Sequence, residues 1–130
     1  MTMERNLAMA VRRLLAATSV CLLYAIWPTT AQAEIWISEF VADNGGTLLT
    51  KAGEASDWIE LYNSGTGPVN MGGWYLTDKA SVPNKWRFPD GTMIASNSYL
   101  IVFADSSANA VTNGELHANF SLSKDDEYLG

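Results

Sequence analysis

Residues 99–104 read Tyr-Leu-Ile-Val-Phe-Ala, and this stretch decides the fold class. It is apolar at every position, although the side chains of a strand alternate between the two faces of a sheet. A strand that is apolar on both faces needs cover on both. The stretch therefore predicts a central strand with packed material on each side.

In two further stretches, the alternation of side chains between the two faces predicts which residues are buried. In residues 85–88 the alternation predicts that Trp86 and Phe88 face the core, while Lys85 and Arg87 face water. In residues 58–62 it predicts that Ile59 and Leu61 point inward, with Trp58 and Tyr62 on the opposite face, under a loop. The longest loop is expected over residues 45–56.

Strands of this kind recur along the chain, and no window with helical periodicity exceeds two turns. Asp90-Gly91 and Asn113-Gly114 supply the positive φ angles that tight hairpins require. The pattern is typical of an all-β sandwich or barrel. The expected strands are Ile35–Val41, Trp58–Asn63, Trp74–Asp78, Lys85–Phe88, Tyr99–Ala104, Leu116–Leu122 and one that begins near Glu127. The expected core residues are Trp58, Trp74, Trp86, Phe88, Ile101, Phe103 and Phe120.

The first 33 residues predict a helical signal peptide. Arg12 and Arg13 precede an apolar run, residues 14–27, which closes on Ala31-Gln32-Ala33. This order of a basic region, an apolar region and an A-x-A site predicts cleavage between Ala33 and Glu34. The run is too short and too interrupted for a membrane span, which needs about 20 apolar residues. We therefore expect a secreted, periplasmic or cell-surface protein without a stable membrane anchor after cleavage.

Residues 34–130 then form one small domain. The whole chain has a formal net charge of −6, and the predicted signal peptide contains three of its arginines, so the mature part is more acidic still. An acidic surface repels polyphosphate, which argues against nucleic acid as a partner. The only cysteine, Cys21, lies in the signal peptide, so no disulfide is expected in the domain.

Six blocks of sequence, in order, resemble bacterial lamin-tail domains. They are Ile37-Ser38-Glu39-Phe40, Ser56-Asp57-Trp58-Ile59-Glu60-Leu61-Tyr62-Asn63, Gly73-Trp74-Tyr75-Leu76-Thr77-Asp78, Lys85-Trp86-Arg87-Phe88-Pro89, Tyr99-Leu100-Ile101-Val102-Phe103-Ala104 and Leu116-His117-Ala118-Asn119-Phe120-Ser121-Leu122-Ser123. The resemblance implies an immunoglobulin-like β-sandwich of an exported protein, and the family brings no catalytic residues to carry over. Its bacterial members often lie beside hydrolase, nuclease or CotH-type kinase-like domains.

The residues themselves give little sign of catalysis. His117 is the only histidine, and its surroundings show neither a nucleophile elbow nor a cleft signature, so we expect a structural or solvent-facing role. One histidine and no mature cysteine leave no zinc site. Glu39 and Glu60 could in principle act as a glycosidase pair, but two half-buried carboxylates answered by Lys85 or Arg87 are the favoured interpretation.

Calcium stays open as a ligand, because several acidic residues could meet at one end of a sandwich. None of them forms a D-x-D-x-D-G loop, and turn chemistry with a soluble surface explains them as well. We therefore expect no cofactor and no metal site. The acidic residues concerned are Asp43, Asp57, Asp78, Asp90, Asp105, Asp125, Asp126 and Glu127.

The sequence thus predicts a non-enzymatic interaction or adhesion module that docks a neighbouring domain, a protein or a surface polymer. One alternative is a carbohydrate- or cell-wall-binding domain, for which Trp36, Trp58, Trp74 and Trp86 would form the stacking surface. Another is an accessory domain of an exported hydrolase, nuclease or kinase-like protein. Because residues 127–130 resemble only the start of a strand, we expect the domain to be truncated at its C-terminal end.

Overall fold

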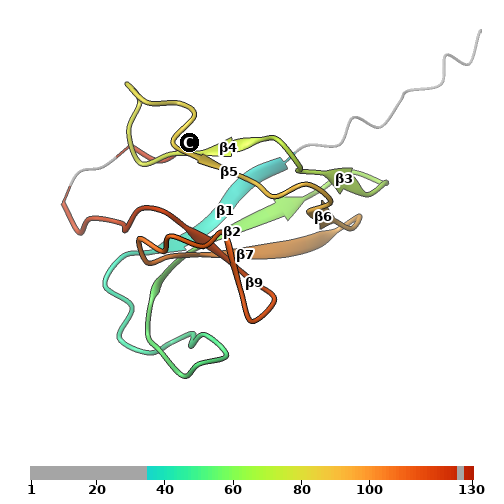
Figure 1. Cartoon of the computed structure of the whole chain (residues 1–130). Coiled ribbons are helices and arrows are strands. Elements are labelled where there is room, and N and C mark those ends of the chain that lie inside the picture. Colours follow the sequence, from blue (N-terminus) through green and yellow to red (C-terminus); the bar gives the residue numbers. More distant parts are fainter. Residues whose placement is uncertain (1–34, 126–127) are drawn as a thin grey trace, which may run out of the picture.

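The computed structural model describes residues 35–125 and 128–130, and these residues are all β. They contain no helix, and so none that could cross a membrane. The strands are β1 (Ile35–Val41), β2 (Asp57–Asn63), β3 (Val69–Asn70), β4 (Tyr75–Leu76), β5 (Trp86–Arg87), β6 (Met93–Ile94), β7 (Ser98–Ala104), β8 (Val111–Thr112) and β9 (Glu115–Ala118) (Figure 1). The predicted signal peptide, with Ala31, Ala33 and Glu34, lies outside the described residues.

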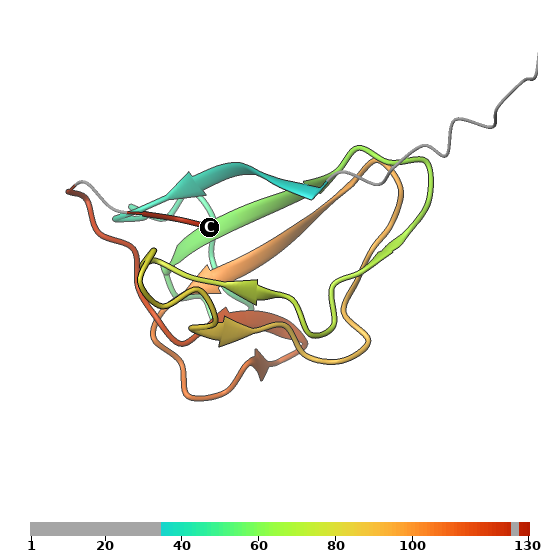
Figure 2. The same ribbon diagram turned by 90° about the horizontal axis from the view of Figure 1, so that it is seen from above.

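A five-stranded sheet of order β1-β2-β7-β9-β8 forms one layer of the sandwich. In Figure 2, β1, β2 and β7 run side by side in cyan, green and orange. Strand β7 pairs antiparallel with β2 and parallel with β9, so it has a neighbour on both sides. The prediction of a central strand from residues 99–104 is confirmed.

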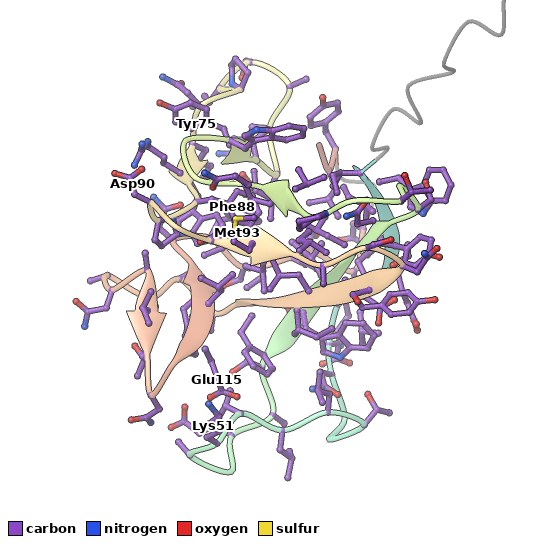
Figure 3. The ribbon with its side chains drawn as sticks, turned by 90° about the vertical axis from the view of Figure 1, so that its right-hand side faces the viewer. Lys51, Tyr75, Phe88, Asp90, Met93 and Glu115 are labelled. Atoms are coloured by element: carbon purple, nitrogen blue, oxygen red, sulfur yellow. The ribbon has the colours of Figure 1, made fainter. Side chains whose placement is uncertain are left out.

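The pairs β3–β6 and β4–β5 form the second layer, over one face of the large sheet. The core between the layers buries Ile59 and Val102 from the large sheet and Phe88 and Ile94 from the short strands. We call this face of the large sheet the inner face. The outer face is the opposite one. The loop 42–56 lies on the outer-face side of the sheet, where Figure 3 labels Lys51 at the bottom. The architecture is that of an immunoglobulin-like sandwich.

The strand predictions succeed where strands are long. Strand β1 has the predicted bounds, and β2 and β7 each begin one residue earlier than expected. The two-residue strands β3, β6 and β8 were not predicted, because two residues are too few to show an alternating pattern. The strand expected near Glu127 falls partly outside the described residues. Gly130 nevertheless pairs with Thr77 through two backbone hydrogen bonds, of 2.7 and 3.0 Å.

Five of the seven expected core residues are buried. These are Trp58, Trp86, Phe88, Phe103 and Phe120. The expectation for Trp74 is wrong, because half of its surface is exposed. Trp74 closes a turn in which its N–H donates to the carbonyl of Met71 at 2.9 Å, and Met71 fills the core instead. Gly73, at φ +88°, lets the chain make this turn.

Ile101 is also outside the core, and it is only partly buried. It belongs to the outward-facing residues of β7, where Glu60 is its cross-strand partner. The short strands therefore never contact it from the inner side. The all-apolar sequence of residues 99–104 does not distinguish between the two faces, which is why Ile101 was placed in the core.

Candidate functional site

Three aromatic side chains form a row across the outer face, in which the two outer rings are exposed and the middle one is half-buried. Trp36, Tyr62 and Tyr99 come from β1, β2 and β7, and they are direct cross-strand partners. The ring centroids of Trp36 and Tyr62 lie 5.9 Å apart, and those of Tyr62 and Tyr99 lie 4.6 Å apart. Trp36 is 47% exposed and Tyr99 is 59% exposed. We call these three residues the aromatic row.

A second row on the same face is buried. Trp58, Phe103 and His117 are cross-strand partners on β2, β7 and β9, and all three are under 9% exposed. Because they point away from the core, something else must cover them. The loop 42–56 does so, and its Leu48 and Leu49 line a small cavity together with Phe103. We call Trp58, Phe103 and His117 the covered row. Trp58 is buried on this face as predicted, whereas Tyr62, which was expected under the same loop, is only half-buried.

The buried Asn44 holds the two ends of this loop together. Its side-chain amide donates to the carbonyl of Ser56 at 2.9 Å, which joins the two ends of the loop. Its side-chain oxygen accepts from the N–H groups of Gly46 and Thr47, at 3.0 and 2.9 Å. The Asn44 N–H donates to the carboxylate of Asp57 at 3.2 Å. A single asparagine thus holds the loop against the start of β2.

Lys51, in the middle part of the loop 42–56, attaches the loop to the β8–β9 hairpin. Its backbone N–H donates to the Glu115 carboxylate at 2.9 Å, and its ammonium donates to the carbonyl of Asn113 at 2.9 Å. Figure 3 labels Lys51 and Glu115 side by side below the sheet. The loop therefore reaches from the end of β1 to the opposite edge of the sheet and stops short of the aromatic row.

Two carboxylates lie between the rows. Glu39 on β1 and Glu60 on β2 are cross-strand partners, next to a β-bulge between Ile37 and Glu39. Glu60 accepts a hydrogen bond from the Ser38 hydroxyl at 2.7 Å. Neither carboxylate has a lysine or arginine partner among the described residues. Like charges that face each other across a sheet destabilise it, so this pair has an energetic cost.

The expectation that Lys85 or Arg87 forms an ion pair with these carboxylates is wrong. Lys85 pairs with the buried Asp78 at 2.6 Å, and Arg87 pairs with Asp90 at 2.6 Å. Both cations belong to β5 or its flank, in the second layer of the sandwich. The thickness of the core separates them from the outer face of the large sheet. Lys85 is in consequence half-buried, although the alternation placed it in water.

His117 belongs to an Asp–His pair without a nucleophile. Its Nδ1 lies 2.7 Å from the Asp105 carboxylate, and the imidazole is buried against Phe103. Its Nε2 is buried and has no hydrogen-bond partner among the described residues. A serine protease-type relay needs a hydroxyl at this nitrogen. The arrangement is that of a structural histidine in the covered row.

Those acidic residues considered for calcium that the structure describes do not gather at one place, and Asp126 and Glu127 lie outside the described residues. Within residues 35–125 and 128–130 there is no group of three or more histidine or acidic side chains that could hold a metal ion. Asp57 is instead held by the Asn44 N–H, and four others pair with a lysine, arginine or histidine side chain. These are Asp43 with Lys124, Asp78 with Lys85, Asp90 with Arg87, and Asp105 with His117.

The tryptophans do not form the surface that sugar stacking would need. Trp58 and Trp86 are buried, so neither ring is free for a ligand. Trp36 lies on β1 in the large sheet, whereas Trp74 precedes β4 in the second layer. The rings that do gather at the surface are the exposed Trp36 and Tyr99, with the half-buried Tyr62 between them. The alternation in residues 58–62 placed Tyr62 on the outer face, but only the strand register shows that Trp36 and Tyr99 flank it.

Comparison with known proteins gives one match. The family model described as Lamin Tail Domain matches residues 28–129. This range contains every strand of the described structure, and it begins inside the segment expected to be cleaved as a signal peptide. No curated protein and no solved structure matches the chain.

Proposed function

The chain belongs to the lamin tail domain family of β-sandwich interaction modules, and we propose that it docks a protein partner on the aromatic row. The observation that carries the proposal is a row of three adjacent aromatic side chains on the outer face, of which Trp36 and Tyr99 are exposed and Tyr62 between them is half-buried. Tryptophan and tyrosine dominate the binding energy of protein interfaces, because they bury a large area at a small entropic cost. The site contributes no catalytic chemistry of its own.

The geometry of the rings favours a protein partner over a glycan. The planes of Tyr62 and Tyr99 are inclined by 33°, and those of Trp36 and Tyr62 by 37°. At centroid distances of 4.6 and 5.9 Å, neighbouring rings cover part of each other's faces. A sugar ring stacks on a free aromatic face, whereas a protein side chain also packs against ring edges and hydroxyl groups. The carbohydrate-binding alternative therefore has less support.

We further propose that the module works outside the cytoplasm. The support is the predicted signal peptide with its site at Ala31-Gln32-Ala33. An exported module of this kind could serve as the accessory domain of a hydrolase or another envelope protein. N-terminal sequencing of the exported protein should begin at Glu34. Recovery of the chain in the membrane fraction with Met1 retained would contradict export and cleavage.

Site-specific photo-crosslinking tests the docking face. A benzophenone amino acid replaces Tyr99 in the aromatic row or, as a matched control, the exposed Met93 in the second layer. Irradiation in the native cells should give a discrete protein adduct from position 99 and none from position 93. Equal adducts at both positions, or an adduct at 93 alone, would overturn the proposed face. A glycan rather than a protein on position 99 would favour the carbohydrate alternative.

A further inference from the structure

The carboxylates beside the aromatic row differ from most of the other described acidic groups. Asp43, Asp78 and Asp90 each pair with a lysine or arginine, Asp105 pairs with His117, and Asp57 and Glu115 each accept a backbone N–H. Glu60 receives only the neutral Ser38 hydroxyl, and no contact is found for Glu39. The two face each other in register. Among the described residues, Glu39 and Glu60 therefore share one face of the sheet without a lysine, arginine or histidine partner.

The carboxylates lie within reach of the rings. Glu60 and Tyr62 are two positions apart on β2 and share its outer face, so their Cα atoms are about 7 Å apart. Trp36 is the cross-strand partner of Tyr62, and Glu39 is that of Glu60. The exposed surface therefore combines aromatic rings with two uncompensated negative charges, and none of the described lysines or arginines forms an ion pair with them.

A guanidinium group matches this combination. Its planar face stacks on tyrosine and tryptophan rings, and its five N–H donors suit carboxylates. Because Glu39 and Glu60 are cross-strand partners, one bound cation can lie opposite both carboxylates at once. The formal net charge of −6 attracts a basic partner over a longer range.

We propose that the partner segment bound by the aromatic row is basic, and that an arginine side chain of it stacks on the row with its guanidinium at Glu39 and Glu60. The inference rests on the proposed function, because it names the chemistry of the partner on the same face. It gives the face a specificity: a neutral or acidic segment would leave the two carboxylates unpaired under the interface.

Peptide titration tests the inference. The probes are the capped peptide Gly-Arg-Gly-Arg-Gly and the same peptide with citrulline in place of arginine, which keeps the shape and removes the charge. The readout is the indole N–H resonance of Trp36 in the NMR spectrum of the whole protein, identified with the variant Trp36→Phe. The arginine peptide should shift this resonance saturably. The citrulline peptide should bind at least about tenfold more weakly, because the buried ion pairs are lost.

Two double variants assign the effect to these carboxylates. Glu39→Gln with Glu60→Gln should weaken the arginine peptide by at least about tenfold. Glu54→Gln with Asp125→Asn removes the same charge from exposed positions outside the aromatic row and should leave binding within about twofold, since distant surface charges are screened by salt. If both double variants weaken binding of the arginine peptide equally, its affinity depends only on the net charge of the protein, and the inference is overturned.

The result can be separated from that of the crosslinking experiment. If the arginine peptide fails to shift Trp36 while position 99 still crosslinks to a protein, the docking face stands and the basic partner is wrong. If citrulline and arginine peptides bind equally, the guanidinium assignment is wrong whatever the crosslinking shows. If the arginine peptide binds as expected and position 99 gives no adduct, the face recognises cations but the proposed docking function fails.

Discussion

The aromatic row and the covered row lie on the same face of the same sheet and share strands β2 and β7. Each has three ring-bearing side chains in register across neighbouring strands. Trp58 in the covered row is 8% exposed, and Trp36 in the aromatic row is 47% exposed. The loop 42–56 makes the difference, because Asn44 and Lys51 hold it over one row only. Both rows have three ring-bearing side chains on the same face and share two strands, so the cover by the loop is what separates the buried row from the open one.

The largest difference between the rows should appear in stability. The variant Trp58→Ala should lower the free energy of unfolding by about 3–5 kcal/mol, as for other buried aromatic residues cut to alanine. Urea denaturation of the purified protein measures the change. If the variant unfolds at the same urea concentration as the parent, the covered row is not part of the packed structure.

Weakening the attachment of the loop 42–56, which covers this row, should lower the free energy of unfolding by less than Trp58→Ala does. Asn44→Ala removes the side-chain hydrogen bonds to Ser56, Gly46 and Thr47 and should cost about 2–3 kcal/mol, at a net value of about 1 kcal/mol per bond. Amide hydrogen exchange should rise in residues 43–56 and stay unchanged at Trp36. Unchanged exchange in the loop would show that other contacts hold it.

His117 should matter for stability and not for function. The variant His117→Ala leaves the Asp105 carboxylate without its imidazole partner, which should cost about 1–3 kcal/mol. Crosslinking from position 99, and any activity of a parent protein that carries the module, should be unchanged. Loss of turnover in a variant that remains folded would restore the enzymatic interpretation.

The smallest effect on stability belongs to the aromatic row. Tyr99→Ala removes an exposed ring that contacts Tyr62 and should cost about 1 kcal/mol or less, as for other cross-strand pairs. The same variant should abolish crosslinking from a benzophenone at the neighbouring Tyr62. A cost as large as that of Trp58→Ala would contradict the difference between the rows.

The sequence by itself was enough for the long strands and for most of the inward side chains. The strand over residues 35–41, the central strand over 99–104, and the burial of Ile59, Trp86 and Phe88 all follow from alternation, which is a local property of the chain. The six blocks similar to lamin-tail domains agree with the family match, and they also indicated the all-β sandwich.

Only the tertiary structure decided what lies on each face. Alternation shows that Trp58 and Tyr62 share a face, but it does not show that a loop covers one of them. The turn at Gly73 put Trp74 outside, and the pairing of strands brought Trp36 and Tyr99 to either side of Tyr62. Register and loop contacts join residues far apart in the chain. A pattern with a period of two residues carries no information about such contacts, which is the physical reason why the sequence predicts the core of this domain better than its binding surface.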